Sequence, residues 1–271
     1  MLLKLLKNDL KAVFKYWWIS AIISIALSFF GSFLIGFLRN YDGYSPMLGI
    51  LSILGIMLII GGLSAFSLLS FIFVIIRFYR NFFTDEGYLT FTLPVKRNEL
   101  FLSKFITGIF TSFATGTVLV IDVCIILFLG MIDDKSFWKA LGSLIEFLPD
   151  LVTSYWLHII EIAVIGVGMT LLSLLLIFAC VTFSSIVIKK AKVFWAIMIY
   201  YGVTSLISLF FQVCFSFGGV WLVSWIAEFS AAYIKSLFAL FLFVVILFIA
   251  SGCLGLYILN HWMLDKKLNL N

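Results

Sequence analysis

The chain has 271 residues, of which 64% are hydrophobic and 11% charged, with a mean hydropathy of +1.21. Water-soluble globular proteins carry about 25% charged residues, so this composition excludes an ordinary soluble enzyme or binding domain. The charges are gathered into short clusters between long apolar runs, as in chains that cross a bilayer repeatedly. We therefore predict an all-α polytopic membrane protein with a single transmembrane domain over residues 1–271. Its net charge of +5 needs no nucleic-acid partner to explain it.

The first 15 residues have an amphipathic pattern. Lys4, Lys7, Lys11 and Lys15 are three or four residues apart, so they share one helical face, and apolar residues occupy most of the remainder. This predicts an N-terminal amphipathic helix that lies in the membrane interface. A plain anchor that only obeys charge asymmetry would produce the same pattern.

Six transmembrane helices account for the apolar runs that follow. We place them at about residues 17–38, 47–76, 105–131, 155–188, 193–215 and 237–263. The second run is long, about 45 Å at ~1.5 Å per residue against a hydrocarbon core of ~30 Å. It must tilt or project beyond the bilayer, and a projecting end would carry the next loop away from the membrane. Pro94 should end helical structure in that loop, with a new helix starting near Lys96.

Two further segments are predicted on the outer side. Residues 132–150 carry charges of both signs, and their apolar side chains share one helical face, which predicts an interfacial helix. Residues 216–234 contain Gly218, Gly219, two tryptophans and Glu228, which interrupt any separate span. We interpret them as a re-entrant or interfacial hairpin before the last helix.

The distribution of basic residues predicts the orientation. Of the 18 lysines and arginines, 14 lie in the N-terminal helix, the first loop, the loop between the fourth and fifth spans, and the C-terminus. Arg39, Lys135, Lys139 and Lys235 are left on the opposite side. Because positive charge accumulates on the cytoplasmic side, both termini are predicted to be cytoplasmic.

The loop over residues 77–104, RFYRNFFTDEGYLTFTLPVKRNELFLSK, is the most informative stretch. Basic residues that only marked the cytoplasmic side would need neither a central acidic pair nor aromatic residues with partly helical spacing. A short amphipathic helix offered to a protein partner fits this pattern better. The candidate docking residues are Phe82, Phe83, Asp85, Glu86, Tyr88 and Phe91.

Residues 82–104, FFTDEGYLTFTLPVKRNELFLSK, closely resemble the first cytoplasmic loop of small type-2 ABC permeases of low-GC Gram-positive bacteria. In that family DEGYLTFTLP recurs, followed by a basic pair and LLSK, and the loop carries the coupling helix that docks on a separate ATPase. The rest of the chain is similar in layout, which is that of ABCG-like exporters. The resemblance implies a permease subunit in a bacterial cell membrane that exports an amphiphilic peptide, antimicrobial compound or lipid.

The resemblance also implies the partners. They are two copies of a soluble ABC ATPase, a second copy of this permease or a related one, and membrane lipids. The sequence contains no GxxxxGK[ST] motif for nucleotide phosphates, so ATP and Mg are expected in the ATPase and no cofactor in this chain. We predict no catalytic residues here and no enzymatic activity.

Asp122, His158 and Glu161 are the ionisable residues predicted at membrane depth. Such groups usually face a bundle interior or water, so they are candidates for a substrate path. Alternatively, His158 and Glu161 lie in the interface, and Asp122 holds two helices together through hydrogen bonds. A different function also fits, namely an ATP-independent, ion-coupled transporter that uses Asp122 and Glu161. The HIIE sequence at 158–161 supplies a single histidine, so no metal site is predicted.

Small residues recur at helical spacing in two spans, where they suit close helix contact within one subunit or across a dimer. They are Gly61, Gly62, Ser64, Ser67 and Ser70 in the second span, and Ser251, Gly252 and Gly255 in the sixth.

Overall fold

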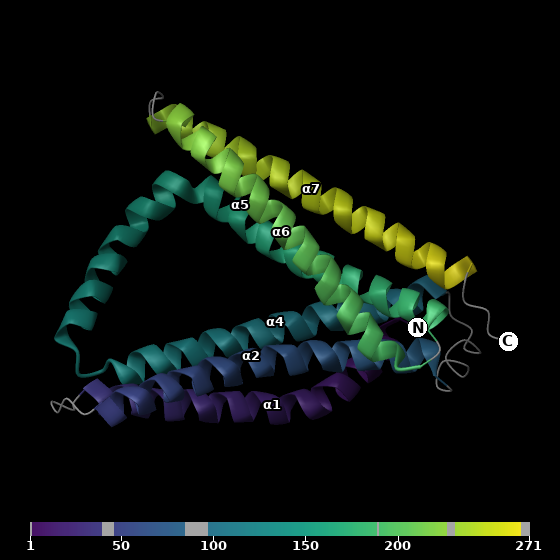
Figure 1. The fold of residues 1–271 in the computed structure, drawn as a ribbon, viewed down its shortest axis with the longest axis horizontal. Coiled ribbons are helices and arrows are strands. Elements are labelled where there is room, and N and C mark those ends of the chain that lie inside the picture. Colours follow the sequence, from purple (N-terminus) through teal and green to yellow (C-terminus); the bar gives the residue numbers. More distant parts are fainter. Residues whose placement is uncertain (1, 40–45, 85–96, 189, 227–230, 267–271) are drawn as a thin grey trace. The chain divides into compact units, whose positions relative to one another are not determined.

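The protein is represented by a computed structural model that describes residues 2–39, 46–84, 97–188, 190–226 and 231–266. Within these ranges every regular element is a helix, which confirms the all-α prediction. The helices are α1 (Leu2–Arg39), α2 (Pro46–Phe83), α4 (Arg97–Gly130), α5 (Lys135–Val187), α6 (Lys192–Ile226) and α7 (Ala231–Lys266) (Figure 1).

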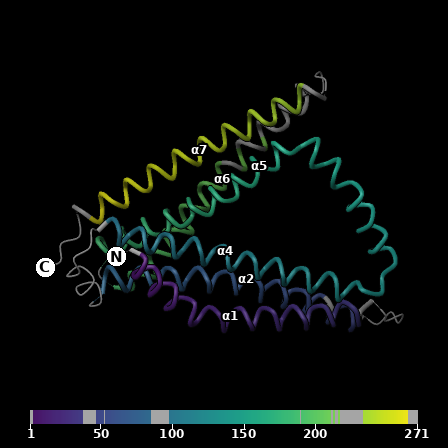
Figure 2. The backbone as a smooth tube through the Cα atoms, turned by 180° about the vertical axis from the view of Figure 1, so that it is seen from behind, coloured from purple at the N-terminus to yellow at the C-terminus, as the bar shows by residue number. Residues whose placement is uncertain are grey.

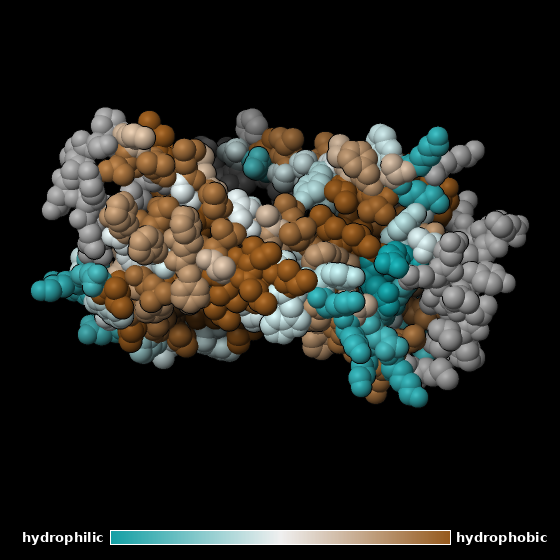
Figure 3. Space-filling view, turned by 90° about the horizontal axis from the view of Figure 1, so that it is seen from below, coloured by the Kyte–Doolittle hydropathy of each residue, from teal (hydrophilic) through white to brown (hydrophobic). Residues whose placement is uncertain are grey.

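Each of these six helices contains a stretch long and apolar enough to cross a membrane. Large apolar side chains are widely exposed on them, including Phe33 at 72%, Met47 at 73% and Leu206 at 70%. On the face shown in Figure 3, hydrophobic side chains cover the middle and hydrophilic ones gather toward the ends. Hydrocarbon, rather than water, is the solvent for such a surface. The fold is therefore that of a multi-pass membrane protein.

The helices extend past the predicted spans. Helix α2 has 38 residues, about 57 Å at ~1.5 Å per residue, and continues through Arg77 to Phe83. The next described helix, α4, begins at Arg97, close to the start that Pro94 predicts. Pro94 itself and the loop residues 85–96 lie outside the described residues.

The predicted N-terminal interfacial helix and the predicted hairpin at 216–234 both fall within longer helices of the structure. Helix α1 runs unbroken from Leu2 into the first span, with a bend near its N-terminal end (Figure 2). Helix α6 runs on to Ile226 and α7 starts at Ala231, so the described part of segment 216–234 consists of the ends of these two helices.

Helix α5 changes direction within its 53 residues. Pro149 cannot donate a backbone hydrogen bond, and Tyr155 has non-helical backbone angles (φ −128°, ψ 21°). The helical segment predicted within 132–150 is present before this kink, starting at Lys135. Contacts divide the chain into two compact units near the same point. The first contains α1, α2 to Asn81, α4 and α5 to Pro149, and the second contains the end of α2 from Phe82, the rest of α5, α6 and α7.

In the first unit α1, α2 and α4 lie side by side (Figures 1 and 2). Trp17 of α1 is buried between its neighbours. Its indole N–H donates to Thr115 Oγ1 of α4 at 3.0 Å, and its ring lies 6.0 Å from that of Phe66 on α2. Buried Trp needs such a polar partner, so this contact sets the register of α1 on α4.

Small hydroxyl residues allow α1 and α4 to approach closely. Every fourth residue of α1 along the middle of the helix is a buried serine, and α4 has buried threonines at the same interval. They are Ser20, Ser24, Ser28 and Ser32 on α1, and Thr107, Thr111 and Thr115 on α4. Each hydroxyl donates to a carbonyl of its own helix, so none is left unsatisfied at the interface.

In the second unit glycines bring α5 and α7 together. A Cβ atom on Gly168 would lie 2.8 Å from Ile249, and one on Gly252 would lie 3.1 Å from Leu172. The fully buried Asn260 of α7 donates from Nδ2 to the Leu175 carbonyl of α5 at 2.9 Å. Gly252 therefore packs within the chain, as the plainer of the two interpretations predicts.

Candidate functional site

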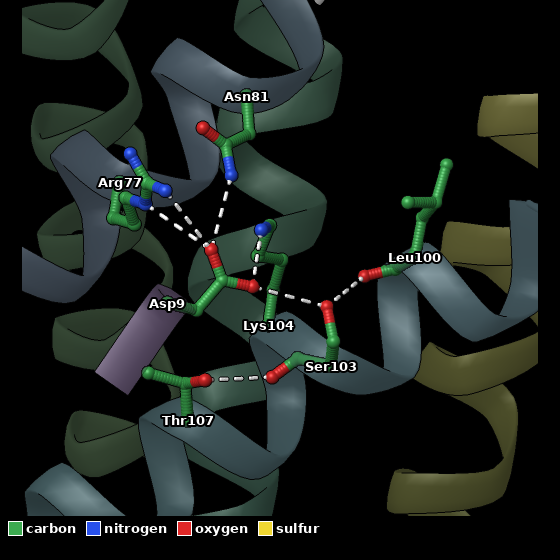
Figure 4. Close-up of polar contacts among 7 residues, drawn as sticks. All are labelled: Asp9, Arg77, Asn81, Leu100, Ser103, Lys104 and Thr107. Atoms are coloured by element: carbon green, nitrogen blue, oxygen red, sulfur yellow. Dashed lines mark hydrogen bonds and ion pairs between the residues drawn. The ribbon is translucent and has the colours of Figure 1, made fainter. Parts of the chain in front are cut away.

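A buried ion cluster joins three helices of the first unit. Asp9 of α1 lies among Arg77 and Asn81 of α2 and Ser103 and Lys104 of α4 (Figure 4). We call these five residues the Asp9 cluster. Asp9 is 2% exposed and Lys104 4%, so both are removed from water almost completely. The side chain of Arg77 is 27% exposed, so it connects the cluster with solvent.

Both oxygens of the Asp9 carboxylate are used. Oδ1 accepts from Arg77 Nε at 3.2 Å, lies 3.2 Å from Arg77 Nη2, and accepts from Asn81 Nδ2 at 3.3 Å. Oδ2 pairs with Lys104 Nζ and lies 3.1 Å from Ser103 Oγ. The Ser103 hydroxyl has one proton, which it can give either to Asp9 or to the Leu100 carbonyl at 2.9 Å.

Helical geometry brings these side chains together. At about 100° per residue, Asp9 lies on nearly the opposite side of α1 from the face of Lys4, Lys7, Lys11 and Lys15. That side is the packed one, as the 3% exposure of Val13 one turn later shows. On α2 the two partners are one turn apart and share a face. On α4 Ser103 and Lys104 are adjacent in sequence and point about 100° apart, and both reach Asp9 Oδ2.

Asp9 is the site residue that the sequence interpretation missed. It is the single acidic residue among the first 41 residues and stands in a helix with four lysines. Its position on the apolar face was the signal that could have found it. A buried carboxylate is stable only when cations and donors surround it, so a lone acid on a packing face predicts basic partners elsewhere in the chain.

The Asp9 cluster lies at the two helix ends that flank residues 85–96, the central part of the loop predicted to dock on a partner. Asn81 is two residues before the end of α2, and Lys104 is seven residues after the start of α4. Residues 85–96 connect these two helix ends. Asp9 therefore bonds to both described ends of the predicted 77–104 loop. Of the candidate docking residues, Phe82 is 2% exposed and Phe83 half-buried, so Phe82 is not available at the surface of this structure. The other four, Asp85, Glu86, Tyr88 and Phe91, lie outside the described residues.

Asp122 is fully buried in α4, and Ser24 and Ser28 of α1 face its carboxyl group. Both hydroxyls donate to carbonyls of their own helix, at 3.0 Å to Ala21 and 2.7 Å to Ile25. Among the described residues, neither carboxyl oxygen of Asp122 therefore has a hydrogen-bond partner. Burying an acid without hydrogen bonds costs stability. Whether Asp122 lines a substrate path or joins α1 to α4 stays a prediction.

Replacing Asp122 by leucine, which has the same branched shape without polar atoms, should raise the free energy of unfolding by about 1–3 kcal/mol. Asp122→Asn keeps the polarity and should change it by less than about 1 kcal/mol. Equilibrium unfolding in mixed micelles measures both. If Asp122→Leu instead destabilises the protein, the carboxyl group holds the two helices together and the structural alternative is correct.

His158 and Glu161 belong to the second unit and lie on one face of α5, with His158 Nδ1 3.5 Å from Glu161 Oε2. His158 is 7% exposed, and its ring packs edge to face on Phe238 of α7 at 5.5 Å. Nearby, Lys235 of α7 donates to the Ser154 carbonyl and lies 4.6 Å from the ring of Tyr155. His158 is thus covered by Phe238 of α7, and Glu161 is 13% exposed, so neither is freely solvated. Whether they share a path with Asp122 stays a prediction.

Within the described ranges, no three His, Cys, Asp or Glu side chains gather as ligands for a metal ion. Comparison with known proteins finds no match: no family model, no curated protein and no solved structure is significantly similar to the chain. The function of the protein is therefore inferred from the site geometry and from the loop sequence.

Proposed function

We propose that this chain is the permease subunit of an ATP-driven exporter and that the Asp9 cluster transmits the movement of the docking loop to the membrane helices. The supporting observation is the position of the cluster at the two helix ends that bound the loop. A soluble ATPase that binds residues 85–91 would pull on the ends of α2 and α4. Through Asp9 the same displacement reaches α1.

This mechanism requires that the loop bind differently to the ATP-bound and the free partner, because only differential binding shifts a conformational equilibrium. The bonds of Asp9 make α1, α2 and α4 move as one body at this end of the first unit. We assign the polar groups of a substrate path to Asp122 in the first unit and to His158 and Glu161 in the second. This path opens when the helices move. Asp122 is closed to water in the present structure.

The finer membrane placement is part of the same proposal. The lysine face of α1 lies in the cytoplasmic interface, residues 132–150 and 216–234 lie at the outer one, and both termini are cytoplasmic. The membrane is the bacterial plasma membrane, and the substrate is an amphiphile such as a peptide, an antimicrobial compound or a lipid. A second permease copy, or a related chain, completes the exporter. Gly61 and Ser64 are exposed on α2 and are available for that contact.

Gentle solubilisation tests the proposal directly. A tagged permease purified from its native host should carry a soluble ATPase in a one-to-one ratio, measured by quantitative mass spectrometry of the purified complex. A variant with the loop residues 85–91 replaced by a Gly/Ser linker of equal length should lose the ATPase and still insert in the membrane.

The ion-coupled alternative predicts a different result. Transport in proteoliposomes would then proceed without any nucleotide-binding protein, follow an imposed proton gradient, and be abolished by Asp122→Asn or Glu161→Gln. Such an outcome would contradict the proposed dependence on ATP.

A further inference from the structure

A groove in the second unit is not used by the proposed transport mechanism. It lies among α5, α6 and α7, has a volume of about 540 Å³, and is lined almost entirely by apolar side chains. Its walls include Leu176 and Val187 of α5, Val203 of α6, and Trp262 of α7. Val187 is 59% exposed and Trp262 47%, so the groove opens to the surroundings of the protein.

The length of the groove matches one leaflet of a bilayer. From Leu176 to Val187 the wall of α5 covers 12 residues, or 11 steps of ~1.5 Å, about 16 Å. The hydrocarbon core is ~30 Å thick, so half of it is ~15 Å. One end of the groove is at the turn between α5 and α6, and the other is near the middle of the spans.

The end at the turn is basic. Helix α5 ends at Val187 and α6 begins at Lys192, and the turn between them has the sequence Ile188-Lys189-Lys190-Ala191. Lys190 is exposed and Lys192 half-buried. No acidic residue occurs in the sequence between Glu161 and Glu228. Helix α7, whose Met263 lines the groove, ends at Lys266.

We propose that this groove binds one acyl chain of an anionic phospholipid, with the phosphate held by Lys190 and Lys192. The chain supplies each part that such a lipid needs: an apolar channel one leaflet long, positive charge at headgroup level, and a tryptophan at the edge. This inference does not depend on ATP-driven transport.

Purified protein exchanged into nanodiscs or mixed micelles tests the site with two probes, dioleoyl phosphatidylglycerol and dioleoyl phosphatidylcholine. Native mass spectrometry should show one tightly bound phosphatidylglycerol per chain and no equivalent phosphatidylcholine. Each lysine near a membrane surface contributes about 1 kcal/mol to binding anionic lipid, which corresponds to about 5-fold in affinity. The Lys190→Gln, Lys192→Gln double variant should therefore bind phosphatidylglycerol about 30-fold more weakly.

A second variant separates the apolar contribution from the charge. Val203→Trp fills the groove from α6 without changing a charge and should abolish retention of phosphatidylglycerol. Its matched control is Val164→Trp, in a neighbouring apolar groove of about 710 Å³ between α5 and α7, which should retain the lipid. Size-exclusion chromatography establishes that each variant is folded. Equal retention of the two lipids by the unmodified protein, or full retention of phosphatidylglycerol by either the lysine variant or Val203→Trp, would overturn the proposal.

Discussion

Asp9→Asn should lower the free energy of unfolding by about 3–5 kcal/mol, the cost of leaving a buried cation without its counter-charge. Asparagine has the shape of aspartate but one acceptor oxygen instead of two, so it loses the charge and can accept at only one of the two positions used by Asn81 and Ser103. The loss of the Asp9 charge affects Lys104 most, because Lys104 is 4% exposed, whereas Arg77 retains contact with solvent. Equilibrium unfolding in mixed dodecyl maltoside and SDS micelles measures the difference.

A double-mutant cycle identifies the cause. Lys104→Met on its own leaves Asp9 with Arg77 and should also destabilise, but Asp9→Asn combined with Lys104→Met removes both buried charges and should be more stable than Asp9→Asn alone. Lys11→Gln, an exposed change on the same helix, is the matched control and should stay within about 0.5 kcal/mol of the unmodified protein. If Asp9→Asn behaves like Lys11→Gln, the Asp9 cluster does not hold the three helices together.

The second large effect is expected in the loop. Reversing Asp85 and Glu86 to lysine should abolish substrate-stimulated ATP hydrolysis in the reconstituted complex while leaving the permease inserted. Within residues 77–97 these two residues are the entire negative charge, between Arg77 and Arg80 on one side and Lys96 and Arg97 on the other. Reversal leaves only positive charges within residues 77–97. Contact of these charges with the like-charged surface of the former partner costs several kcal/mol.

The matched control reverses an acidic pair at the other end of the first unit. Asp133→Lys with Asp134→Lys makes the same change in net charge in the turn between α4 and α5, and ATP hydrolysis should remain stimulated. Unchanged stimulation after reversal of Asp85 and Glu86 would remove the docking role of the loop. A comparison with Asp9→Asn is also informative, since that variant should still bind the ATPase yet show weaker stimulation, because α1 no longer follows the loop.

The sequence by itself determined the membrane class and the helices. Apolar runs longer than the bilayer is thick have no stable alternative to a helix in hydrocarbon, because each backbone N–H and C=O must be paired within its own segment. The start of α4 at Arg97 followed from Pro94 in the same way, since the constraint is local. The kink at Tyr155 did not, because it coincides with contacts from Lys235 of α7 to the Ser154 carbonyl and the Tyr155 ring. The continuation of α6 to Ile226 was not predicted either.

Only the tertiary structure decided which polar residues meet. Asp9 lies 68 residues before Arg77 and 95 before Lys104, and no local pattern links positions so far apart. The four lysines dominate the charge pattern of the first helix, so this pattern does not predict a role for Asp9 on the opposite face. Likewise, the closest approach of α1 to α4 uses serines and threonines that hydropathy treats as minor interruptions. Pairing of buried groups depends on which helix faces are in contact, and that is a property of the packed protein rather than of any single segment.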